Sequence, residues 1–358
     1  MRIVHTESSL GWGGQEIRIL SESQGLAARG HEVRLLCPPE ARIFAEAPKW
    51  GLEPEAVPIA RKNLGGFFAL KEKLRQPCDV VSTHSSTDTW LSALALRSLG
   101  RPYPLVRTRH ISAPVPRDPL TRWLYTRATT RIVTTGEALR SELVERNGFS
   151  AAAIESVPTG IDTARFRPGD KMAARKALGL PAEKVLVGIV ATLRSWKGHR
   201  FLLEALPREA GLVIVGDGPQ RANLEAQVAR LGVGYKVLFA GNQQDVLPWL
   251  QSFDVFALPS YANEGVPQAL IQAMLAGLPC VTTNIGSMAE LAIHDRTALV
   301  VQPQDPGALA AALEKVLQDR ILAGHLGTAA RAHCERRFSR EQMLDKMERI
   351  YAGVAGGR

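Results

Sequence analysis

Residues 1–36 read MRIVHTESSL GWGGQEIRIL SESQGLAARG HEVRLL, and the pattern of this segment indicates the fold class. The short apolar run Arg2–His5 predicts a strand, and after a glycine loop the segment Gln15–Arg29 predicts a helix. Gly30 then ends the helix, and Glu32–Leu36 predicts a second strand. A strand, a helix and another strand joined by short loops are typical of a parallel sheet covered by helices.

The same alternation continues along the chain and restarts once, near the Pro/Gly-rich residues 156–162 (SVPTGID). Before this point, further strands are predicted at Val80–Thr83, Leu105–Thr108 and Arg131–Thr134. After it, strands are predicted at Val185–Val190, Leu212–Val215, Val237–Ala240, Val255–Leu258, Cys280–Thr282 and Ala298–Val301. Helices are predicted at the end of the chain, at Pro306–Leu317, Ile321–Arg336 and Arg340–Ala352.

This arrangement predicts two doubly wound α/β domains with a hinge near residues 162–181. We expect the first domain at residues 1–165, the second at residues 166–337, and a C-terminal helix within residues 338–358 that returns toward the first domain. Sheets of this kind bind ligands at the carboxyl ends of their strands, so the predicted site is the cleft between the two domains.

The composition is that of an ordinary globular protein, because the 358 residues are 45% hydrophobic and 22% charged. The longest apolar runs have the length of strands, far below the ~20 residues of a membrane span. The N-terminus turns polar after four residues and holds no signal-peptide core, so we expect a cytoplasmic protein. The cysteines lie far apart, which favours reduced thiols over a disulfide or zinc site: Cys37, Cys78, Cys280 and Cys334.

The net charge of +9 is concentrated in two segments. Residues 97–131 hold eight arginines and one acid, Asp118. Residues 61–75 (RKNLGGFFALKEKLR) hold five basic residues and one acid, Glu72, among phenylalanines and leucines. Such segments favour an anionic partner, either phospholipid, phosphosugar or nucleic acid, although a solvated basic surface explains each of them equally well. The mixture in residues 61–75 is typical of a segment that lies on a membrane surface.

A glycine-rich sequence, GWGGQ at residues 11–15, separates the first predicted strand from the first helix. Glycines let backbone N–H groups approach an anion, and the start of a helix adds positive potential. The third glycine of a dinucleotide fingerprint is missing, so a single phosphate is the better-fitting ligand. A glycine-rich turn without any ligand is the alternative.

A second motif, TLRSWKG at residues 192–198, follows the first strand of the second domain. Arg194 and Lys197 lie three residues apart in this loop and can converge on one anion. A planar guanidinium fork and a compact ammonium together suit a diphosphate. The motif lacks the upstream glycine of a P-loop, and two exposed bases without a ligand are the alternative.

A third motif, SYANEGVP at residues 260–267, precedes a predicted helix. Pro267 suits a first helical position, and Gly265 leaves backbone N–H groups open to an anion at the helix start. Glu264 either accepts hydrogen bonds from ligand hydroxyls or only offsets the helix dipole. Gln272 follows eight residues later, which on a helix is roughly 12 Å along the same broad face. That distance would span a sugar at one end and a ribose at the other.

These motifs, taken in order, resemble the family 4 glycosyltransferases of the GT-B fold. The order is GWGGQ, a histidine at the end of a strand in the first domain, VPTGIDTARFRP, RSWKG, VGDGP, EGVPxxLxQAMxxGxPCV and AEL. The resemblance covers nearly the whole chain. It implies two doubly wound Rossmann-like domains that face each other across a cleft, and sugar transfer from a nucleotide-sugar donor with retention of configuration. It implies neither a bound metal nor another cofactor, because basic side chains and helix N-termini hold the diphosphate.

The same resemblance implies roles by position. Catalytic roles fall on Arg194, Lys197, Glu264 and His110, with the two cations on the diphosphate, the glutamate on the sugar hydroxyls and the histidine in the sugar pocket. Donor-binding roles fall on Gly13, Gly14, Gly216, Asn242, Gln243, Gly265, Val266, Pro267, Gln272 and Glu290, the last near a helix start on the donor side. Acceptor or membrane contacts are expected at His84, Arg107, Arg109, Lys62, Phe67, Phe68, Lys71 and Lys73.

One residue departs from the family pattern, in which two glutamates are separated by seven residues. The second is here Gln272. An amide both donates and accepts, so it can still bind a ribose diol, but it loses the strength of a charge-assisted hydrogen bond. The departure bears on donor affinity and nucleotide identity.

Three other protein classes are weighed against a transferase. A nucleotide-sugar epimerase can share the architecture, but the EGVP block and the RxxKG pair favour transfer to an acceptor. A nicotinamide oxidoreductase would need the missing glycine fingerprint. A nucleic-acid-binding protein would use the basic excess, but aromatic residues are only 6% of the chain and no known nucleic-acid module occurs, so we expect no nucleic-acid partner.

The sequence therefore predicts a hexosyltransferase that moves a sugar from a UDP-sugar to a cell-envelope glycan or a lipid-linked acceptor, such as a lipopolysaccharide precursor. Residues 61–75 add reversible binding to an anionic membrane at its inner face.

Overall fold

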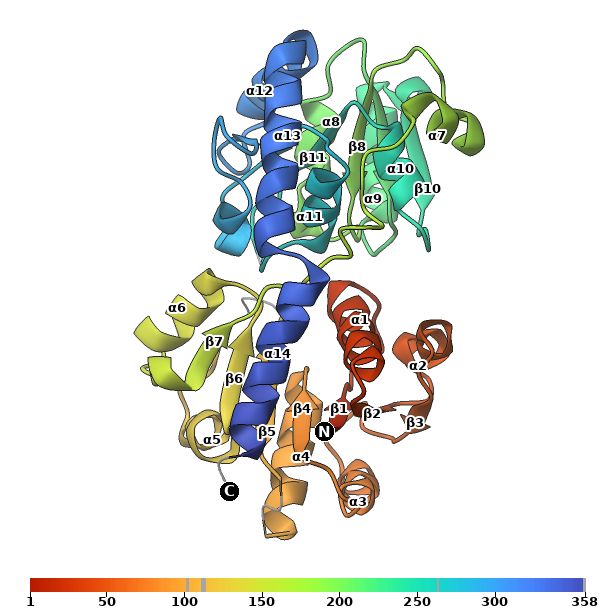
Figure 1. Cartoon of the computed structure of the whole chain (residues 1–358). Helices are drawn as coiled ribbons and strands as arrows, with labels where there is room; N and C mark the ends of the chain where they lie inside the picture. Colours follow the sequence, from red (N-terminus) through yellow and green to blue (C-terminus); the bar gives the residue numbers. More distant parts are fainter. Residues whose placement is uncertain (101–102, 111–113, 263, 357–358) are drawn as a thin grey trace. The chain divides into compact units, whose positions relative to one another are not determined.

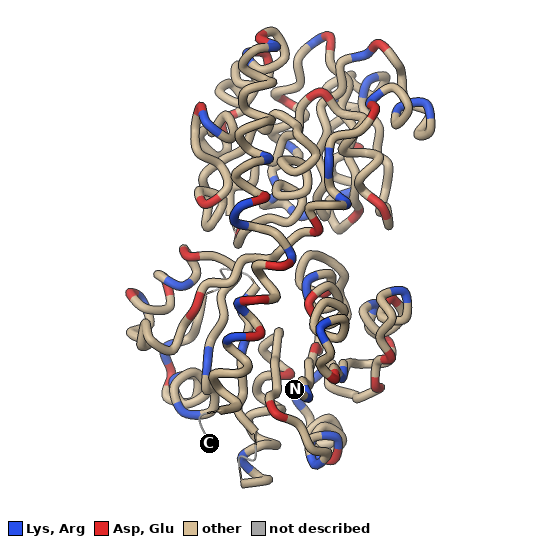
Figure 2. The backbone as a smooth tube through the Cα atoms, viewed as in Figure 1, with Lys and Arg blue, Asp and Glu red and all other residues tan. Residues whose placement is uncertain are grey.

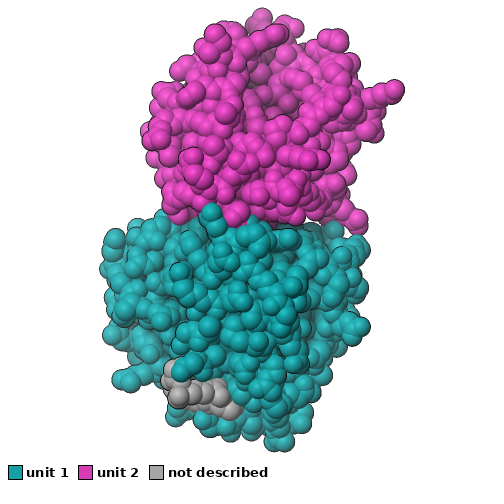
Figure 3. Space-filling view, viewed as in Figure 1, with its two compact units in different colours: residues 1–160, 340–358 teal, residues 161–339 magenta. Residues whose placement is uncertain are grey.

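The computed structural model describes residues 1–100, 103–110, 114–262 and 264–356. Arg101 of the arginine-rich segment and Asn263 of the third motif lie outside the described residues. The chain forms two compact units, residues 1–160 with 340–358 and residues 161–339 (Figure 3). The end of the chain therefore belongs to the first unit, although the whole second unit separates it from that unit in sequence.

The first unit is built on a parallel sheet with the strand order β3-β2-β1-β4-β5-β6-β7. The strands are β1 Arg2–Thr6, β2 Glu32–Cys37, β3 Pro54–Ala56, β4 Val80–Thr83, β5 Leu105–Arg109, β6 Arg131–Thr134 and β7 Ile154–Ser156. The order reverses between β1 and β4, because β1 pairs with β2 on one side and with β4 on the other. This is the switch point of a doubly wound sheet, where such sheets bind ligands.

Helices cover both faces of this sheet (Figure 1). They are α1 Gly14–Ala28, α2 Arg42–Glu46, α3 Leu64–Lys73, α4 Ser86–Ser98, α5 Pro119–Trp123, α6 Glu137–Glu145 and α14 Arg340–Ala355, with short helices η1 Ala47–Trp50, η2 Leu124–Ala128 (a π-helix) and η3 Ala151–Ala153. Successive residues of a strand point to opposite faces. Accordingly Val81 lies in a core with α3 and α4, whereas its neighbour Val80 lies in a second core with α14.

Buried polar contacts attach α14 to the first unit. Tyr351 Oη lies 2.8 Å from Glu22 Oε1 and 2.9 Å from Ser82 Oγ, and all three residues are buried. A Cβ placed on Gly25 of α1 would lie 2.4 Å from Leu344 Cδ1, so α1 and α14 approach closely there and a larger residue would displace the Leu344 side chain. Charged residues of both signs lie along α14 (Figure 2). Arg29, which directly follows α1, contacts the carboxylates of Glu341, Asp345 and Glu348 at 2.7, 2.8 and 2.9 Å.

The second unit repeats the architecture with a parallel sheet in the order β10-β9-β8-β11-β12-β13. The strands are β8 Leu186–Val190, β9 Gly211–Val215, β10 Val237–Gly241, β11 Val255–Leu258, β12 Cys280–Thr282 and β13 Leu299–Val300. The helices are α7 Lys171–Leu178, α8 His199–Glu204, α9 Arg221–Leu231, α10 Leu247–Ser252, α11 Gln268–Leu275, α12 Pro306–Gln318 and α13 Arg320–Arg337, with 3₁₀ turns η4 Ser195–Lys197, η5 Gly234–Lys236 and η6 Gly286–Glu290. Here the order reverses between β8 and β11.

The doubly wound α/β architecture expected from the sequence is confirmed, and each predicted strand occurs within about two residues of its expected bounds. The sequence did not predict β3 and β7, which are short strands at the two edges of the first sheet. The four cysteines are buried, as expected. Within the described ranges, no helix is both long and apolar enough to cross a lipid bilayer.

Candidate active site

The predicted donor residues gather at one edge of the second sheet. Loops that follow β9, β8, β11 and β12 lie side by side in that order, because the carboxyl ends of parallel strands meet at the same edge. These loops contain the VGDGP, RSWKG, EGVP and GSMAE sequences, respectively. The RSWKG and EGVP loops flank the switch point between β8 and β11.

Two backbone contacts hold the RSWKG loop against the EGVP loop. Gly198 has a φ of +78°, and a Cβ there would lie 2.0 Å from the carbonyl oxygen of Pro259. The N–H of Tyr261 donates to the carbonyl oxygen of Trp196 at 2.9 Å. Gly198 is therefore needed both because its backbone is left-handed and because a side chain would collide with Pro259. The two loops are fixed relative to each other.

The result is a partly buried ion pair between two predicted catalytic residues. Lys197 Nζ donates to Glu264 Oε1 at 2.7 Å, and Glu264 is only 4% exposed. An ammonium has three donors, so Lys197 keeps two for a ligand while the glutamate holds it in place. The structure thus brings together residues that lie 67 positions apart in the sequence.

Arg194 differs from Lys197 in its exposure. It precedes η4, its side chain is exposed, and its guanidinium lies 5.8 Å from the centre of the Trp196 ring. Its side chain makes no hydrogen bond or ion pair with any residue in the described part of the chain. An exposed guanidinium beside a fixed ammonium is available to an anion that the ammonium has bound.

The loop after β12 supports Glu264 from the other side. Gly286 has a φ of +60°, and a Cβ there would lie 2.1 Å from the carbonyl oxygen of Glu264. Thr283 Oγ1 donates to the carbonyl oxygen of Ser260 at 2.5 Å. Glu290 was expected near a helix start, and this was wrong: it is the last residue of η6, where its carbonyl oxygen lies 2.7 Å from His333 Nε2.

The start of α11 also corrects two expectations. Pro267 is the N-cap residue and not the first helical residue, since α11 begins at Gln268. Residues 264–267 are therefore not helical, and the rise of roughly 12 Å expected between Glu264 and Gln272 does not apply. Gln272 lies in the second turn of α11 and is half-buried. Gly265 is half-buried and Val266 buried in the segment that enters the helix.

Three further predicted donor-binding residues lie at the same edge. Gly216 has a φ of +138°, and a Cβ there would lie 2.1 Å from the carbonyl oxygen of Ala191, so the loop after β9 packs directly on the loop after β8. Asn242 is exposed after β10. The Gln243 amide donates to the carbonyl oxygen of Ala240 at 2.6 Å, which leaves its own carbonyl oxygen as an acceptor.

In the first unit, Gly13 and Gly14 lie at the start of α1. Gly13 is the N-cap with extended backbone (φ −177°), and a Cβ there would make only an ordinary contact, 3.8 Å from Glu16 Oε2. Neither conformation nor crowding therefore requires glycine at position 13. What its missing side chain provides is an open approach to the first turn of a 15-residue helix, as an anion would need.

A buried polar cluster at the switch point of the first sheet was not predicted. Glu7 accepts hydrogen bonds from the Ser9 N–H (2.7 Å), Gln15 Nε2 (2.5 Å) and Ser85 Oγ (2.5 Å). Burial, and secondly the neighbouring Asp88, raise the pKa of Glu7 to about 8. Burial likewise raises the pKa of Asp88 to about 6. The position of Glu7 directly after the first strand was the available signal in the sequence.

Next to this cluster, three imidazoles form a chain. His110 Nε2 lies 3.1 Å from His84 Nδ1, and His84 Nε2 lies 2.9 Å from His5 Nδ1. His84 was expected to face a ligand, but it is 4% exposed, so it contacts His110 and His5 instead. His110 itself is half-buried and follows β5.

Arg107 and Arg109 of β5 are organised by Tyr125. The Arg107 guanidinium lies 4.4 Å from the centre of the Tyr125 ring, and Arg109 Nη1 donates to the Tyr125 hydroxyl at 2.7 Å. Arg107 is 6% exposed, which leaves little of its side chain for a membrane surface, and its expected contact with the acceptor stays a prediction. Arg109 is half-buried.

The predicted membrane segment forms α3, which has one buried and one exposed face. Phe67 packs against the core, whereas Phe68 is 60% exposed and Leu64 is 75% exposed. Lys62 is exposed above the Trp90 ring, and Lys71 is half-buried. Lys73 was expected on the basic face, but it pairs with Glu55 at 2.8 Å, so its charge is compensated.

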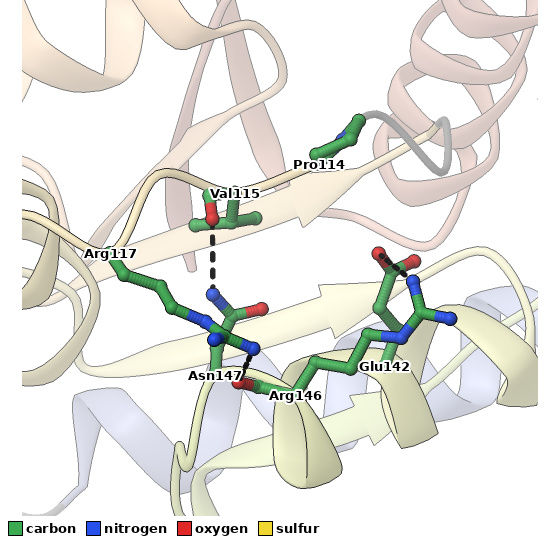
Figure 4. Close-up of a pocket in the computed structure, with 6 residues that line it drawn as sticks. All are labelled: Pro114, Val115, Arg117, Glu142, Arg146 and Asn147. Atoms are coloured by element: carbon green, nitrogen blue, oxygen red, sulfur yellow. Dashed lines mark hydrogen bonds and ion pairs between the residues drawn. The ribbon is translucent and has the colours of Figure 1, made fainter.

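A small cavity of about 240 Å³ lies elsewhere in the first unit, between the segment before α5 and the end of α6 (Figure 4). Asn147 Nδ2 donates to the carbonyl oxygen of Val115, and Arg117 donates to that of Arg146. None of the predicted site residues lines it. Among the residues that the structure describes, no group of three or more His, Cys, Asp or Glu side chains is arranged to hold a metal ion.

Comparison with known proteins identifies relatives of both units. The family model for glycosyl transferases group 1 matches residues 170–333, and the model for glycosyltransferase family 4 matches residues 12–165. The D-inositol 3-phosphate glycosyltransferase of Mycobacterium tuberculosis (strain H37Rv) is 27% identical over 390 residues, which cover 96% of this chain and 79% of that protein.

Solved structures show the same fold. HepE from Anabaena in complex with UDP has a TM-score of 0.88 at 20% identity, covering 99% of this chain and 100% of that one. Sucrose-phosphate synthase from Thermosynechococcus elongatus has a TM-score of 0.83 at 22% identity, covering both chains fully. WaaG, described as a glycosyltransferase involved in lipopolysaccharide biosynthesis, has a TM-score of 0.74 at 19% identity, covering 99% and 100%. Two matched family models, the GT-B fold and the site motifs lead to one conclusion: the chain belongs to the family 4 glycosyltransferases.

Proposed function

We propose that this glycosyltransferase moves a hexose from a UDP-sugar to a cell-envelope glycan or glycolipid, such as a lipopolysaccharide precursor, with retention of configuration. The observation that carries the donor proposal is the Lys197–Glu264 pair beside the exposed Arg194 at the switch point of the second sheet. UDP in the HepE structures, and the lipopolysaccharide role of WaaG, support the nucleotide and the acceptor class.

The chemistry follows from the charges. Breaking the bond between sugar and diphosphate places negative charge on the leaving group while the sugar becomes oxocarbenium-like. Lys197 and Arg194 would stabilise that charge. Two side-chain cations would supply the positive charge, so we propose that no metal ion is required.

Glu264 would have a binding role. Its carboxylate is held 2.7 Å from Lys197 Nζ, and an ion-paired carboxylate is a poor nucleophile but a good acceptor for sugar hydroxyls. With no second carboxylate assigned to the reaction, the departing phosphate would help to deprotonate the acceptor, which suits substitution on the same face of the sugar.

The first test measures how much the two cations contribute to turnover. Arg194→Ala and Lys197→Ala are each expected to lower turnover of the donor by ~10²-fold or more, the scale of losing one transition-state donor. The donor is first identified by thermal-shift measurements with UDP-, GDP- and ADP-sugars. Turnover is then measured by transfer or hydrolysis assays with and without EDTA.

Arg230→Ala is the matched control, because Arg230 is an exposed arginine in the last turn of α9. Near-native turnover in both Arg194→Ala and Lys197→Ala would contradict the proposed donor site. Loss of turnover in EDTA would contradict the absence of a metal requirement.

The second test concerns the membrane. We propose that the exposed face of α3 binds the anionic inner face of a membrane reversibly, with Phe68 and Leu64 inserted and Lys62 and Lys71 near the headgroups. Phe68→Ser combined with Lys62→Glu is expected to reduce co-sedimentation with phosphatidylglycerol vesicles at low salt.

Tyr235→Ser is the control for loss of an exposed aromatic residue, since Tyr235 is 80% exposed in the second unit. Equal sedimentation of the native chain with neutral and anionic vesicles would rule out the proposed membrane surface.

A further inference from the structure

The chain of histidines connects the interior of the first unit to its ligand-facing edge. His5 is in β1, His84 directly follows β4 and His110 directly follows β5, which are neighbouring strands. The two hydrogen bonds measure 2.9 Å (His5 Nδ1 to His84 Nε2) and 3.1 Å (His84 Nδ1 to His110 Nε2). His84 therefore uses both of its ring nitrogens within the chain. His110 keeps Nδ1, which makes no hydrogen bond with any residue that the structure describes.

Burial favours the neutral form of all three rings. Burial lowers the pKa of His5, of His84 and of His110, and in His84 the two neighbouring histidines lower it further. A neutral imidazole carries one N–H and one lone pair, so each hydrogen bond needs a donor nitrogen on one ring and a lone pair on the other. Only two arrangements satisfy both bonds, and they run in opposite directions.

In the first arrangement, His5 Nδ1–H donates to His84 Nε2, and His84 Nδ1–H donates to His110 Nε2. His110 then carries its proton on Nδ1 and presents an N–H donor. In the second arrangement every bond is reversed, and His110 presents a lone pair at Nδ1. The direction of the chain therefore decides whether His110 gives or accepts a hydrogen bond.

The inner end of the chain favours the first arrangement. His5 Nε2 is buried and has no hydrogen-bond partner among the described residues. In the first arrangement this nitrogen carries a lone pair and no proton. In the second it carries a proton, and its N–H group has no acceptor. Buried N–H groups without partners are rarer in proteins than under-used acceptors.

We propose that His84 and His5 are positioning residues for His110, and that their hydrogen bonds hold it as the neutral tautomer with its proton on Nδ1. His110 then offers an N–H donor to an oxygen of its ligand and cannot take a proton at that nitrogen. The ligand, a donor sugar, rests on the proposed function. The tautomer does not, so the test below can fail or succeed independently of turnover.

The test reads the tautomer directly in the full chain labelled with ¹⁵N-histidine. Protonated and unprotonated ring nitrogens have widely separated ¹⁵N shifts, and long-range ¹H–¹⁵N correlations assign them to Nδ1 and Nε2. Free neutral histidine in water prefers the proton on Nε2. We expect the native chain to show the opposite tautomer, Nδ1–H, for His5, His84 and His110, with the His110 signals identified from their loss in His110→Phe.

Variants of His84 separate positioning from packing. In His84→Phe the ring volume remains but both hydrogen bonds are lost, and His110 is expected to revert to the Nε2–H tautomer. In His84→Asn the amide nitrogen lies close to the place of Nδ1, and His110 is expected to keep Nδ1–H. This second variant keeps the test decisive if His84→Phe does not fold. His325→Gln, an exposed histidine of α13, is the labelling control.

An Nε2–H tautomer of His110 in the native chain would overturn the proposal, as would an unchanged Nδ1–H tautomer in folded His84→Phe. Binding of UDP, measured by calorimetry, is expected to be the same in His84→Asn and the native chain. If UDP does not bind to the native chain, the proposed donor fails while the result for the tautomer stands.

Discussion

At the scale of single residues, burial controls the charge state of Glu7. Its side chain has no exposed surface, and this burial favours the neutral acid, although the three hydrogen bonds that it accepts favour the ionised form. Because the folded state raises its pKa from 4.5 to about 8, its contribution to stability is complete below pH 4.5 and is lost as the pH rises through 8. The three histidines act in the opposite sense: their lowered pKa values give stability above about pH 6.5 that is lost as the pH falls.

We therefore expect Glu7→Gln to become progressively more stable relative to the native chain between pH 5 and pH 8, because an amide cannot ionise. Urea unfolding of both chains across this range gives the difference in free energy of unfolding, in which the contributions of other groups cancel. Glu145→Gln, a change of an exposed glutamate on α6, is expected to give no such trend. Parallel curves for Glu7→Gln and the native chain would show that Glu7 is ionised in the folded protein at all these pH values.

At the scale of elements, glycines set the spacing of the loops around the donor site. Gly198 and Gly232 share a left-handed conformation, with φ of +78° and +66°. They differ in their surroundings, because a Cβ on Gly198 would meet Pro259, whereas a Cβ on Gly232 would meet nothing within 4 Å. Comparing alanine variants of the two glycines therefore separates the free-energy cost of a left-handed backbone from the cost of disturbing the contact between the loops.

Gly232→Ala is expected to cost ~1–2 kcal/mol of stability, the penalty for a left-handed alanine. Gly198→Ala is expected to cost more, and to weaken UDP binding as well, since the RSWKG loop must move away from Pro259 and take Lys197 with it. Urea unfolding and calorimetry measure the two effects. Equal losses in the two variants, with UDP binding intact, would mean that the loop contact does not position Lys197.

The sequence predicted most helices and strands but not the contacts between residues of different elements. The central strands were predictable because apolar runs such as Val255–Leu258 are buried on both faces. The edge strand β3 begins with proline and has no strand pattern, so nothing in its residues indicated it. The motif residues Lys197 and Glu264 were predicted separately, and only the resemblance joined them. The contact of His5 with His84 spans 79 positions, which no local pattern encodes.

At the scale of the whole chain, α14 completes a unit that begins 339 residues earlier. Tyr351 makes its contacts with Glu22 and Ser82 inside that unit. Tyr351→Phe leaves both partners buried without this hydroxyl, so a loss of ~1–3 kcal/mol in the free energy of unfolding is expected. Tyr235→Phe removes an exposed hydroxyl and is expected to change little. A Tyr351→Phe chain as stable as Tyr235→Phe would show that the hydroxyl does not fasten α14.

The discontinuity of the first unit has a consequence for biosynthesis. A ribosome releases residues 1–160 long before residues 340–358 exist, so the face of the sheet formed by Ile3, Val80, Val106 and Val133 emerges without α14, with Leu26 of α1 as part of its remaining cover. Translation of the whole second unit must finish before α14 can cover it. During that interval the nascent chain presents an apolar surface that chaperones recognise, and a stalled or truncated translation product would keep it exposed and be prone to aggregate.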